Sequence, residues 1–262
     1  MPFSHDDYTV AWFTPRCHNV YTLGNIGSHN VVMVCLPSGV YGTISAATVV
    51  SHLKSTFLSL RFGLMVGIGG GVPSGSADIR LGDIVVSKPA GTSGGVIQYD
   101  YGKTLRDGRF QHTGMLNKPP LVLLKAVAHL ESDHMAGKSQ LIRILANIQV
   151  PTTTALDQQF LRPTNDWLFR SEYSHDESKF NCCTCDQNQL VIRLERTAEE
   201  PYTHYGLIAS GDQVMKDART RDSIAQGFNV LCFEMEAAGL MDELPSIVIR
   251  GICDYCDSHK NE

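Results

Sequence analysis

Acidic side chains that could handle a sugar and a leaving base follow two apolar segments late in the chain. The segment Phe233–Glu236 carries two carboxylates one residue apart, and it comes directly after the apolar run Val230–Phe233. Asp254 comes after the apolar run Ile247–Ile252. A carboxylate can accept hydrogen bonds from paired sugar hydroxyls, each contributing roughly 1.5–3 kcal/mol. A partly desolvated carboxyl group holds its proton more readily, as a general acid must.

Both acidic clusters also have purely structural interpretations. Glu234 and Glu236 are equally compatible with the start of a helix, whose dipole favours acidic residues. Asp254 is equally compatible with a cap or turn residue. Neither segment decides the question alone.

A glycine cluster, Gly67 to Gly71 with Ile68 inside it, follows the apolar residues ending near Val66. Successive glycines let a backbone approach a ligand closely and aim N–H groups at it. A tight exit from a strand explains them equally well. The spacing matches neither the dinucleotide-binding GxGxxG pattern nor a phosphate-binding P-loop.

The elements that would position these residues alternate along the chain. Short runs rich in Val and Ile predict buried strands at Val31–Leu36, Phe62–Ile68, Asp83–Ser87 and Ile247–Ile252, with further candidates at Tyr8–Trp12, Tyr205–Ser210 and Val230–Phe233. Helices are predicted between them at Thr43–Leu53, Pro120–Leu130 and Ala237–Glu243. Continuous hydrophobicity predicts a sheet covered by helices on both faces, and ligands bind at the carboxyl ends of strands in such sheets. We expect one α/β domain spanning residues 1–262.

Composition narrows the function classes. The formal net charge is −5, which disfavours non-specific binding to nucleic acid or anionic membrane. No apolar run approaches the roughly 18 residues that span a bilayer. Residues 1–7 lack the features of a secretion signal. We therefore expect a cytoplasmic protein.

A long polar insertion on the sheet scaffold, called the excursion below, is predicted at about residues 131–203. It contains Cys182, Cys183 and Cys185. Structural zinc needs four ligands, and only His175 or His204 could add to this cluster. We expect surface thiols in a reduced loop, with no metal site and no cofactor.

Together these segments resemble the nucleoside phosphorylase superfamily, which includes purine nucleoside phosphorylases and methylthioadenosine/S-adenosylhomocysteine nucleosidases. The matching segments, in family order, are Tyr21–Gly24 with Val31–Leu36, Gly39–Ala47, Leu64–Val72, Leu81–Ser87, Gly206–Asp212, Phe233–Leu240 and Val248–Asp257. Likeness to the fungal branch found in NLR-like proteins is carried by His5–Val10, Gly91–Asp100 and Gly251–Asn261.

The resemblance implies an α/β fold of three layers, with a central mixed sheet flanked by helices. It also implies cleavage of the N-glycosidic bond of a purine nucleoside, by an enzyme that is either a nucleosidase or a purine nucleoside phosphorylase. Glu236 would bind the ribose hydroxyls, and Asp254 would protonate or hydrogen-bond the purine N7. The remaining substrate-binding positions would be Glu234, Met235 under the sugar, Phe233, Val214 and Met215 around the base, and Gly69 and Gly70 beside the phosphate or attacking water.

The nucleophile can be argued one step further from the resemblance. Phosphorylases of this family carry an Arg before the glycine loop and a hydroxyl residue three positions later, and both hold phosphate. The corresponding residues here are Met65 and Ile68, and neither side chain binds an anion. Because an unpaired dianion is costly in a partly buried site, we expect water rather than phosphate.

Two departures from the family leave a second hypothesis open. Trp12–His18 replaces a longer segment and helix, and relatives continue past Glu262 with a helix that covers the sheet. We therefore expect a fold shortened at both ends. The alternative function is a nucleoside-sensing or assembly domain of an NLR-like protein with impaired turnover. In either case family members usually form homo-oligomers.

Overall fold

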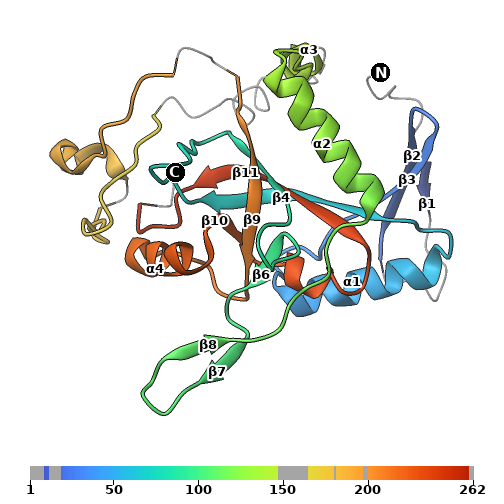
Figure 1. Cartoon of the computed structure of the whole chain (residues 1–262), viewed down its shortest axis with the longest axis horizontal. Helices are drawn as coiled ribbons and strands as arrows, with labels where there is room; N and C mark the ends of the chain where they lie inside the picture. The colour runs from blue at the N-terminus through green and yellow to red at the C-terminus, as the bar shows by residue number, and fades with distance from the viewer. Residues whose placement is uncertain (1–8, 12–18, 147–164, 180, 197–199, 260–262) are drawn as a thin grey trace.

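The computed structural model describes residues 9–11, 19–146, 165–179, 181–196 and 200–259 (Figure 1). The segment 12–18 and the N-terminal part of the fungal likeness, residues 5–8, lie outside the described residues. The predicted strand Tyr8–Trp12 is described over its middle, as β1 (Thr9–Ala11).

A six-stranded mixed sheet forms the body of the fold. Its strands are β4 (Gly63–Gly71), β5 (Ile84–Ser87), β6 (Val96–Gln98), β9 (Thr203–Ser210), β10 (Val230–Glu234) and β11 (Ser246–Asp254). They lie in the order β10-β4-β11-β5-β9-β6, and β10 also pairs with β9, which closes the sheet on itself. The parallel strands β4 and β11 run antiparallel to β10 and β5. The mixed α/β architecture is therefore confirmed.

Two smaller sheets stand apart from this body. β1, β2 (Tyr21–Ile26) and β3 (His29–Val34) form a three-stranded antiparallel sheet. The strand predicted at Val31–Leu36 belongs to this sheet and not to the central one. The hairpin of β7 (Gly102–Thr104) and β8 (Phe110–His112) projects away from the sheet (Figure 1).

Helices pack around the sheet (Figure 1). They are α1 (Thr43–Thr56), α2 (Leu121–Met135), α3 (Leu141–Ala146) and α4 (Ala218–Phe228), with short 3-10 helices η1 (Cys182–Thr184), η2 (Gln187–Gln189) and η3 (Ala237–Gly239). The helix predicted over Ala237–Glu243 is helical only in its first turn. The predicted excursion from residue 131 begins inside α2.

The sequence pattern did not predict α4, although its ends carry clear signals. The Asp217 side chain accepts a hydrogen bond from the Thr220 N–H, which satisfies one of the unpaired donors of the first turn. At the other end Asn229 has a left-handed backbone with φ of 55°, a conformation that Asn tolerates at helix ends. The helix packs Ile224 and Ala225 against a core cluster that includes Phe233.

Coverage of the sheet is uneven. Val248 and Ile252 of β11 are buried with Val85 and Ile208 in the central core. In β4, however, Leu64, Val66 and Ile68 are between 55% and 70% exposed. The expectation that helices cover both faces is wrong for this strand, because only the alternate residue Met65 packs into the core clusters.

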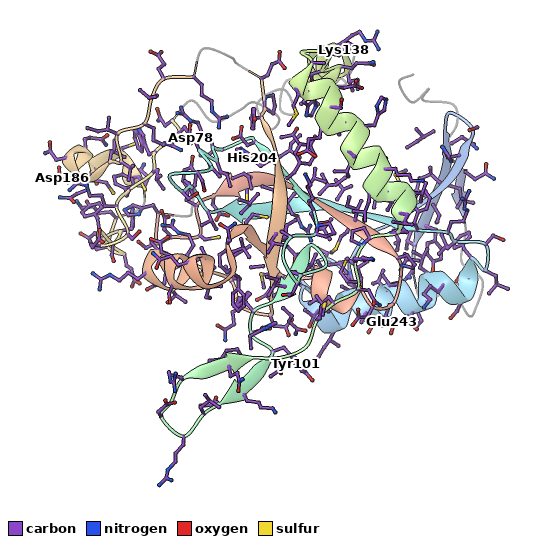
Figure 2. All side chains as sticks on the ribbon, in the orientation of Figure 1. Asp78, Tyr101, Lys138, Asp186, His204 and Glu243 are labelled. Atoms are coloured by element: carbon purple, nitrogen blue, oxygen red, sulfur yellow. The ribbon has the colours of Figure 1, made fainter. Side chains whose placement is uncertain are left out.

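A buried ionic network joins β5 to β9. Asp83 has no exposed surface, and its two carboxylate oxygens contact Arg196 Nη1 at 2.7 Å and His204 Nε2 at 3.0 Å. Burial acts to raise the pKa of Asp83, but the hydrogen bonds from His204 and Arg196 outweigh it and hold that pKa well below its usual range. Arg196 also lies 3.6 Å from Asp78. Figure 2 labels Asp78 and, on β9, His204.

Candidate active site

A buried arginine organises the first acidic cluster. Arg250, on β11, is ion-paired to Glu234 at the end of β10, and both side chains are almost fully buried. The same guanidinium lies 3.4 Å from Glu236. Gly67 is the partner of Arg250 on the neighbouring strand β4, and a Cβ on this glycine would come within 2.0 Å of Arg250 Nη1. The glycine therefore makes room for the guanidinium.

Glu234 and Glu236 differ in their surroundings. Glu234 also accepts hydrogen bonds from the backbone N–H groups of Glu236 and Ala237, so its role is to hold the turn after β10. Glu236 keeps 16% of its side chain exposed. Burial and then the charge of Glu234 raise the pKa of Glu236, and Arg250 opposes the shift. Two carboxylates and one guanidinium leave the cluster with a net charge of −1 when all are ionised.

Asp254 ends β11 in a tight backbone turn. Its Oδ1 accepts a hydrogen bond from the Cys256 N–H at 2.8 Å, and its Oδ2 receives the Cys253 Sγ–H at 3.0 Å. A Cβ on Gly70 would lie 2.6 Å from Asp254 Oδ1 and 2.1 Å from Cys256 Sγ. The carboxyl group therefore packs so closely against Gly70 that any side chain at this position would displace Asp254 or Cys256.

Two of the residues predicted to surround the base share one buried cluster. Phe233 and Met215 lie in one buried cluster with Tyr99 and Cys256, and the Tyr99 and Phe233 rings meet edge to face at 5.4 Å. Cys256 ties this cluster to Asp254. Val214 is 43% exposed, and Met235 is half-buried.

The glycine cluster continues a strand instead of forming the loop after it. β4 runs to Gly71, with Gly70 opposite Phe233 of β10 and Gly69 opposite Ile252 of β11. The strand therefore continues beyond Ile68, where it was predicted to end. The glycines allow neighbouring strands to approach β4 on both sides, and their presentation of N–H groups to a ligand stays a prediction.

The start of α1 joins the same region. Asp212 Oδ1 accepts hydrogen bonds from the Thr43 N–H at 2.7 Å and from its hydroxyl at 3.0 Å. The backbone N–H of Gly42, one residue before the helix, acts to lower the pKa of Glu236. Asp212 thus holds the first turn of the helix, and the predicted Glu236 lies beside its start.

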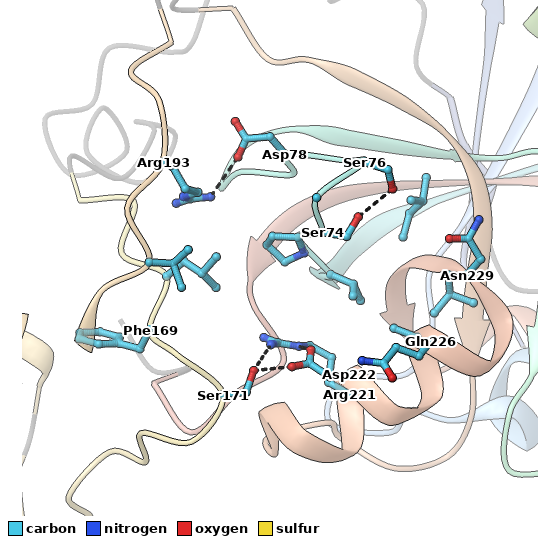
Figure 3. Close-up of a pocket in the computed structure, with 18 of the residues that line it drawn as sticks. Ser74, Ser76, Asp78, Phe169, Ser171, Arg193, Arg221, Asp222, Gln226 and Asn229 are labelled. Carbon is cyan, nitrogen blue, oxygen red and sulfur yellow. Dashed lines mark hydrogen bonds and ion pairs between the residues drawn. The ribbon is translucent and has the colours of Figure 1, made fainter. Parts of the chain in front are cut away.

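Two cavities lie beside this region. The larger, about 680 Å³, is lined by the loop after β4, by α4, by Leu168, Phe169 and Ser171, and by residues 191–194 (Figure 3). Its two arginines are ion-paired, Arg193 with Asp78 and Arg221 with Asp222. The smaller, about 390 Å³, lies between the β8 hairpin and Ala238. Neither Glu236 nor Asp254 is among the described residues that line these two cavities. The candidate site is therefore defined by its acidic side chains and their partners, not by a cavity.

Arg250 is the site residue to which sequence reasoning gave no role. A lone arginine inside the apolar segment Ile247–Ile252 was the available signal, since a buried charge requires a partner. It lies four residues before Asp254, a separation of about 13 Å along a strand. Glu236, which contacts Arg250, and Asp254 therefore flank the same stretch of β4 and β11.

Comparison with known proteins identifies the family to which this fold belongs. A family model described as the phosphorylase superfamily matches residues 3–262. The chain belongs to the phosphorylase superfamily. This phosphorylase-superfamily chain is also 46% identical over 244 residues to a nucleotide-binding leucine-rich repeat (NLR)-like protein of Hyaloscypha variabilis. The match covers 93% of this chain, which spans about a quarter (24%) of that relative's length.

Solved structures share the fold of this superfamily member at low sequence identity. A 5'-methylthioadenosine/S-adenosylhomocysteine nucleosidase from Neisseria meningitidis, bound to methylthio-immucillin-A, matches with a TM-score of 0.55, 16% identity, and coverage of 97% of this chain and 79% of that one. A putative nucleosidase of the same kind from Francisella philomiragia matches with a TM-score of 0.54, 15% identity, and coverage of 97% and 78%. Among the described residues, no helix combines the length and apolar character needed to cross a membrane.

Proposed function

We propose that this domain cleaves the N-glycosidic bond of a purine nucleoside, with water as the nucleophile. The observation that supports this proposal most is the cluster of Glu234, Glu236 and Arg250, with a net charge of −1, which joins β10 to β11, the strand that ends at Asp254. Cleavage of a nucleoside develops positive charge on the sugar. A preorganised negative cluster stabilises that charge in a partly desolvated site.

Each acidic residue has a distinct step in this proposal. Glu236 accepts hydrogen bonds from the ribose hydroxyls and holds the sugar in place. Asp254 gives a proton to the purine N7 as the bond from the sugar C1' to the base breaks. Water forms the new bond to C1' and releases one proton to solvent, from which Asp254 is reprotonated. The products are the free base and ribose.

Three residues support water over phosphate. Met65 packs into the core, and Ile68 presents an exposed apolar side chain. Arg250, the cation beside the glycine cluster, is already engaged by Glu234 and Glu236. A phosphate dianion at Gly69 and Gly70 would compete with two carboxylates for that guanidinium, which disfavours its binding.

The test is product analysis with purified protein. Adenosine, inosine and guanosine are incubated with and without inorganic phosphate, and the products are separated by chromatography. Free base with ribose, unaffected by phosphate, is the expected result. Formation of ribose 1-phosphate would instead establish phosphorolysis and refute the choice of water.

Asp254→Asn tests the general acid. General acid catalysis contributes about 10²–10⁴ in rate, so this variant should lose turnover by that factor. Asp107→Asn, at an exposed position in the β7–β8 hairpin, is the matched control and should keep the wild-type rate. Circular dichroism and the melting temperature show whether both variants remain folded. A wild-type rate for Asp254→Asn would remove this residue from its role.

A second function is favoured by one specific observation. The 46% identical relative is an NLR-like protein about four times as long as the matched region. The alternative is therefore a nucleoside-sensing or assembly domain with impaired turnover. Nucleoside binding measured by calorimetry, without product after prolonged incubation, would favour this alternative over the enzyme.

We also propose that the domain acts in the cytoplasm and associates with further copies of itself. The exposed apolar side chains of Leu64, Val66 and Ile68 support self-association, because contiguous apolar surface marks contact sites. Light scattering on the purified protein tests this, and a monomer at micromolar concentration would contradict it.

A further inference from the structure

Three side chains with metal-binding atoms converge outside the candidate active site. The ligand atoms of His175, Cys182 and Cys185 all lie within 4.8 Å of one another. Both cysteines are buried, at 5% and 7% exposure, while His175 is half-buried. The expectation of surface thiols is therefore wrong for Cys182 and Cys185, and it holds only for the exposed Cys183.

The local backbone creates this convergence. Asn181 begins the short helix η1, and its side chain accepts a hydrogen bond from the Cys183 N–H at 3.2 Å. The Cys185 N–H in turn donates to the Cys182 carbonyl at 3.0 Å. This single turn directs the first and last cysteines of the CxxC inward and leaves Cys183 outside. Tyr173 fixes the far end, since its hydroxyl accepts from the Asp186 N–H at 2.9 Å.

A fourth candidate ligand comes from the far end of the described chain. His259 is 5% exposed, and neither of its ring nitrogens has a hydrogen-bond partner among the described residues. Its ring stacks on Phe169 at 4.1 Å and meets the His175 ring edge to face at 5.6 Å. Its backbone carbonyl lies 3.9 Å from Cys182 Sγ. A buried imidazole with two unpartnered nitrogens thus lies at the edge of the group formed by His175, Cys182 and Cys185.

We propose that His175, Cys182, Cys185 and His259 bind a zinc ion. A set of two thiols and two imidazoles is a common tetrahedral zinc site, and its soft donors select zinc over magnesium or calcium. Two sulfur ligands of a tetrahedral zinc ion lie about 3.8 Å apart. The observed spread of up to 4.8 Å among three of the ligands thus needs only a small contraction.

A nearby carboxylate, that of Asp257, could orient the ring of His259. Its Nδ1 lies 3.8 Å from Oδ1 of Asp257, which is itself buried. Zinc-binding histidines commonly direct their other nitrogen to a carboxylate, which fixes the ring. Asp257 can take this part once the ring of His259, which is not part of the 4.8 Å group, turns its Nε2 toward the other three ligands.

The ion would stabilise a small subdomain with little core of its own. Among the described residues, Cys182 and Cys185 share a buried cluster with Phe169, and the partly buried Trp167, Tyr173 and Leu190 pack against it. A cluster this small gives the segment little stability, and metal sites replace a hydrophobic core in small units. The ligands come from both the excursion and the turn after Asp254, where Ser258 also accepts from the His175 N–H. Zinc would thus fasten the excursion to the strand end that carries Asp254.

Metal analysis of the full chain is the direct test, and it does not depend on the proposed activity. Protein purified with zinc and dialysed should contain about one zinc ion per chain by mass spectrometry, as four ligands define one site. Cobalt substituted for zinc should give the visible absorption bands of a tetrahedral site with cysteine ligands. Zinc content near zero, or a Cys182–Cys185 disulfide in the purified protein, would overturn the proposal.

Matched variants assign the ligands. Cys182→Ser, Cys185→Ser and His175→Ala should each reduce zinc affinity by at least tenfold in competition with a chromophoric chelator. Cys183→Ser removes a thiol from the same motif and should change nothing. Equal losses for Cys183→Ser and Cys182→Ser would overturn the assignment. His259→Phe keeps the aromatic packing, so unchanged zinc affinity in this variant would remove His259 from the set.

Discussion

Arg250 offers the sharpest test of the site's electrostatics, through Arg250→Met. Methionine fills much of the same volume but leaves Glu234, whose side chain has no exposed surface, without its cation. Removing one partner of a buried ion pair destabilises a protein by about 3–5 kcal/mol. At about 2–4 °C per kcal/mol for a chain near this size, the melting temperature should fall by about 6–20 °C.

Thermal and urea unfolding, followed by circular dichroism, measure this loss. The double variant Arg250→Met/Glu234→Gln removes both charges, so it should recover at least half of the stability that the single variant loses. Arg109→Met is the control, since Arg109 is 77% exposed and pairs with Asp107 at the surface, and its melting temperature should not change. A loss below about 1 kcal/mol in Arg250→Met, or no recovery in the double variant, would refute the argument.

Three further predictions follow from named contacts. Gly70→Ala should displace the carboxyl group of Asp254 and lower turnover, while Gly75→Ala, which has nothing within 4 Å of the added carbon, should be neutral; equal effects on the two rates would contradict this. Asp83→Asn should destabilise the protein by about 3–5 kcal/mol at pH 7. The pKa of Asp83 is lowered in the folded state, so the ionised carboxylate stabilises the fold above its usual pKa of 3.8, and this stabilisation is lost as the pH falls below that value. The melting temperatures of the wild type and of Asp83→Asn should therefore converge in acid. Burial, then the neighbouring carboxylate, raises the pKa of Glu236. As the pH is lowered, kcat/KM should therefore begin to fall at a pH above 4.5, and an acid limb at or below 4.5 would contradict the raised pKa.

Sequence patterns predicted the central strands well because burial leaves a clear trace in composition. The runs at Ile247–Ile252 and Tyr205–Ser210 both became strands of the closed sheet, to within a few residues. The pattern could not show that Val31–Leu36 would join a separate sheet, because apolar runs do not encode their partners. It also missed α4, whose mean character is polar and whose ends are marked only by Asp217 and Asn229.

In the candidate site, too, some features could be predicted from the sequence and others could not. The strand-end positions of Glu236 and Asp254 followed from their place after apolar runs. The partnership of Arg250 with Glu234 did not, because it joins residues 16 positions apart across two strands that are not neighbours in the sheet. The convergence of His175 with the cysteines was equally hidden, since it depends on how one short turn directs its side chains.

The start of α1 lies beside two acidic side chains: Asp212 accepts the Thr43 N–H, and the Gly42 N–H acts to lower the pKa of Glu236. In the proposed function a ribose hydroxyl acts on the same carboxylate as the Gly42 N–H, so sugar binding and docking of the helix start are thermodynamically coupled. Coupling of this kind is reciprocal. A change that loosens the helix start must then alter nucleoside affinity by the same factor.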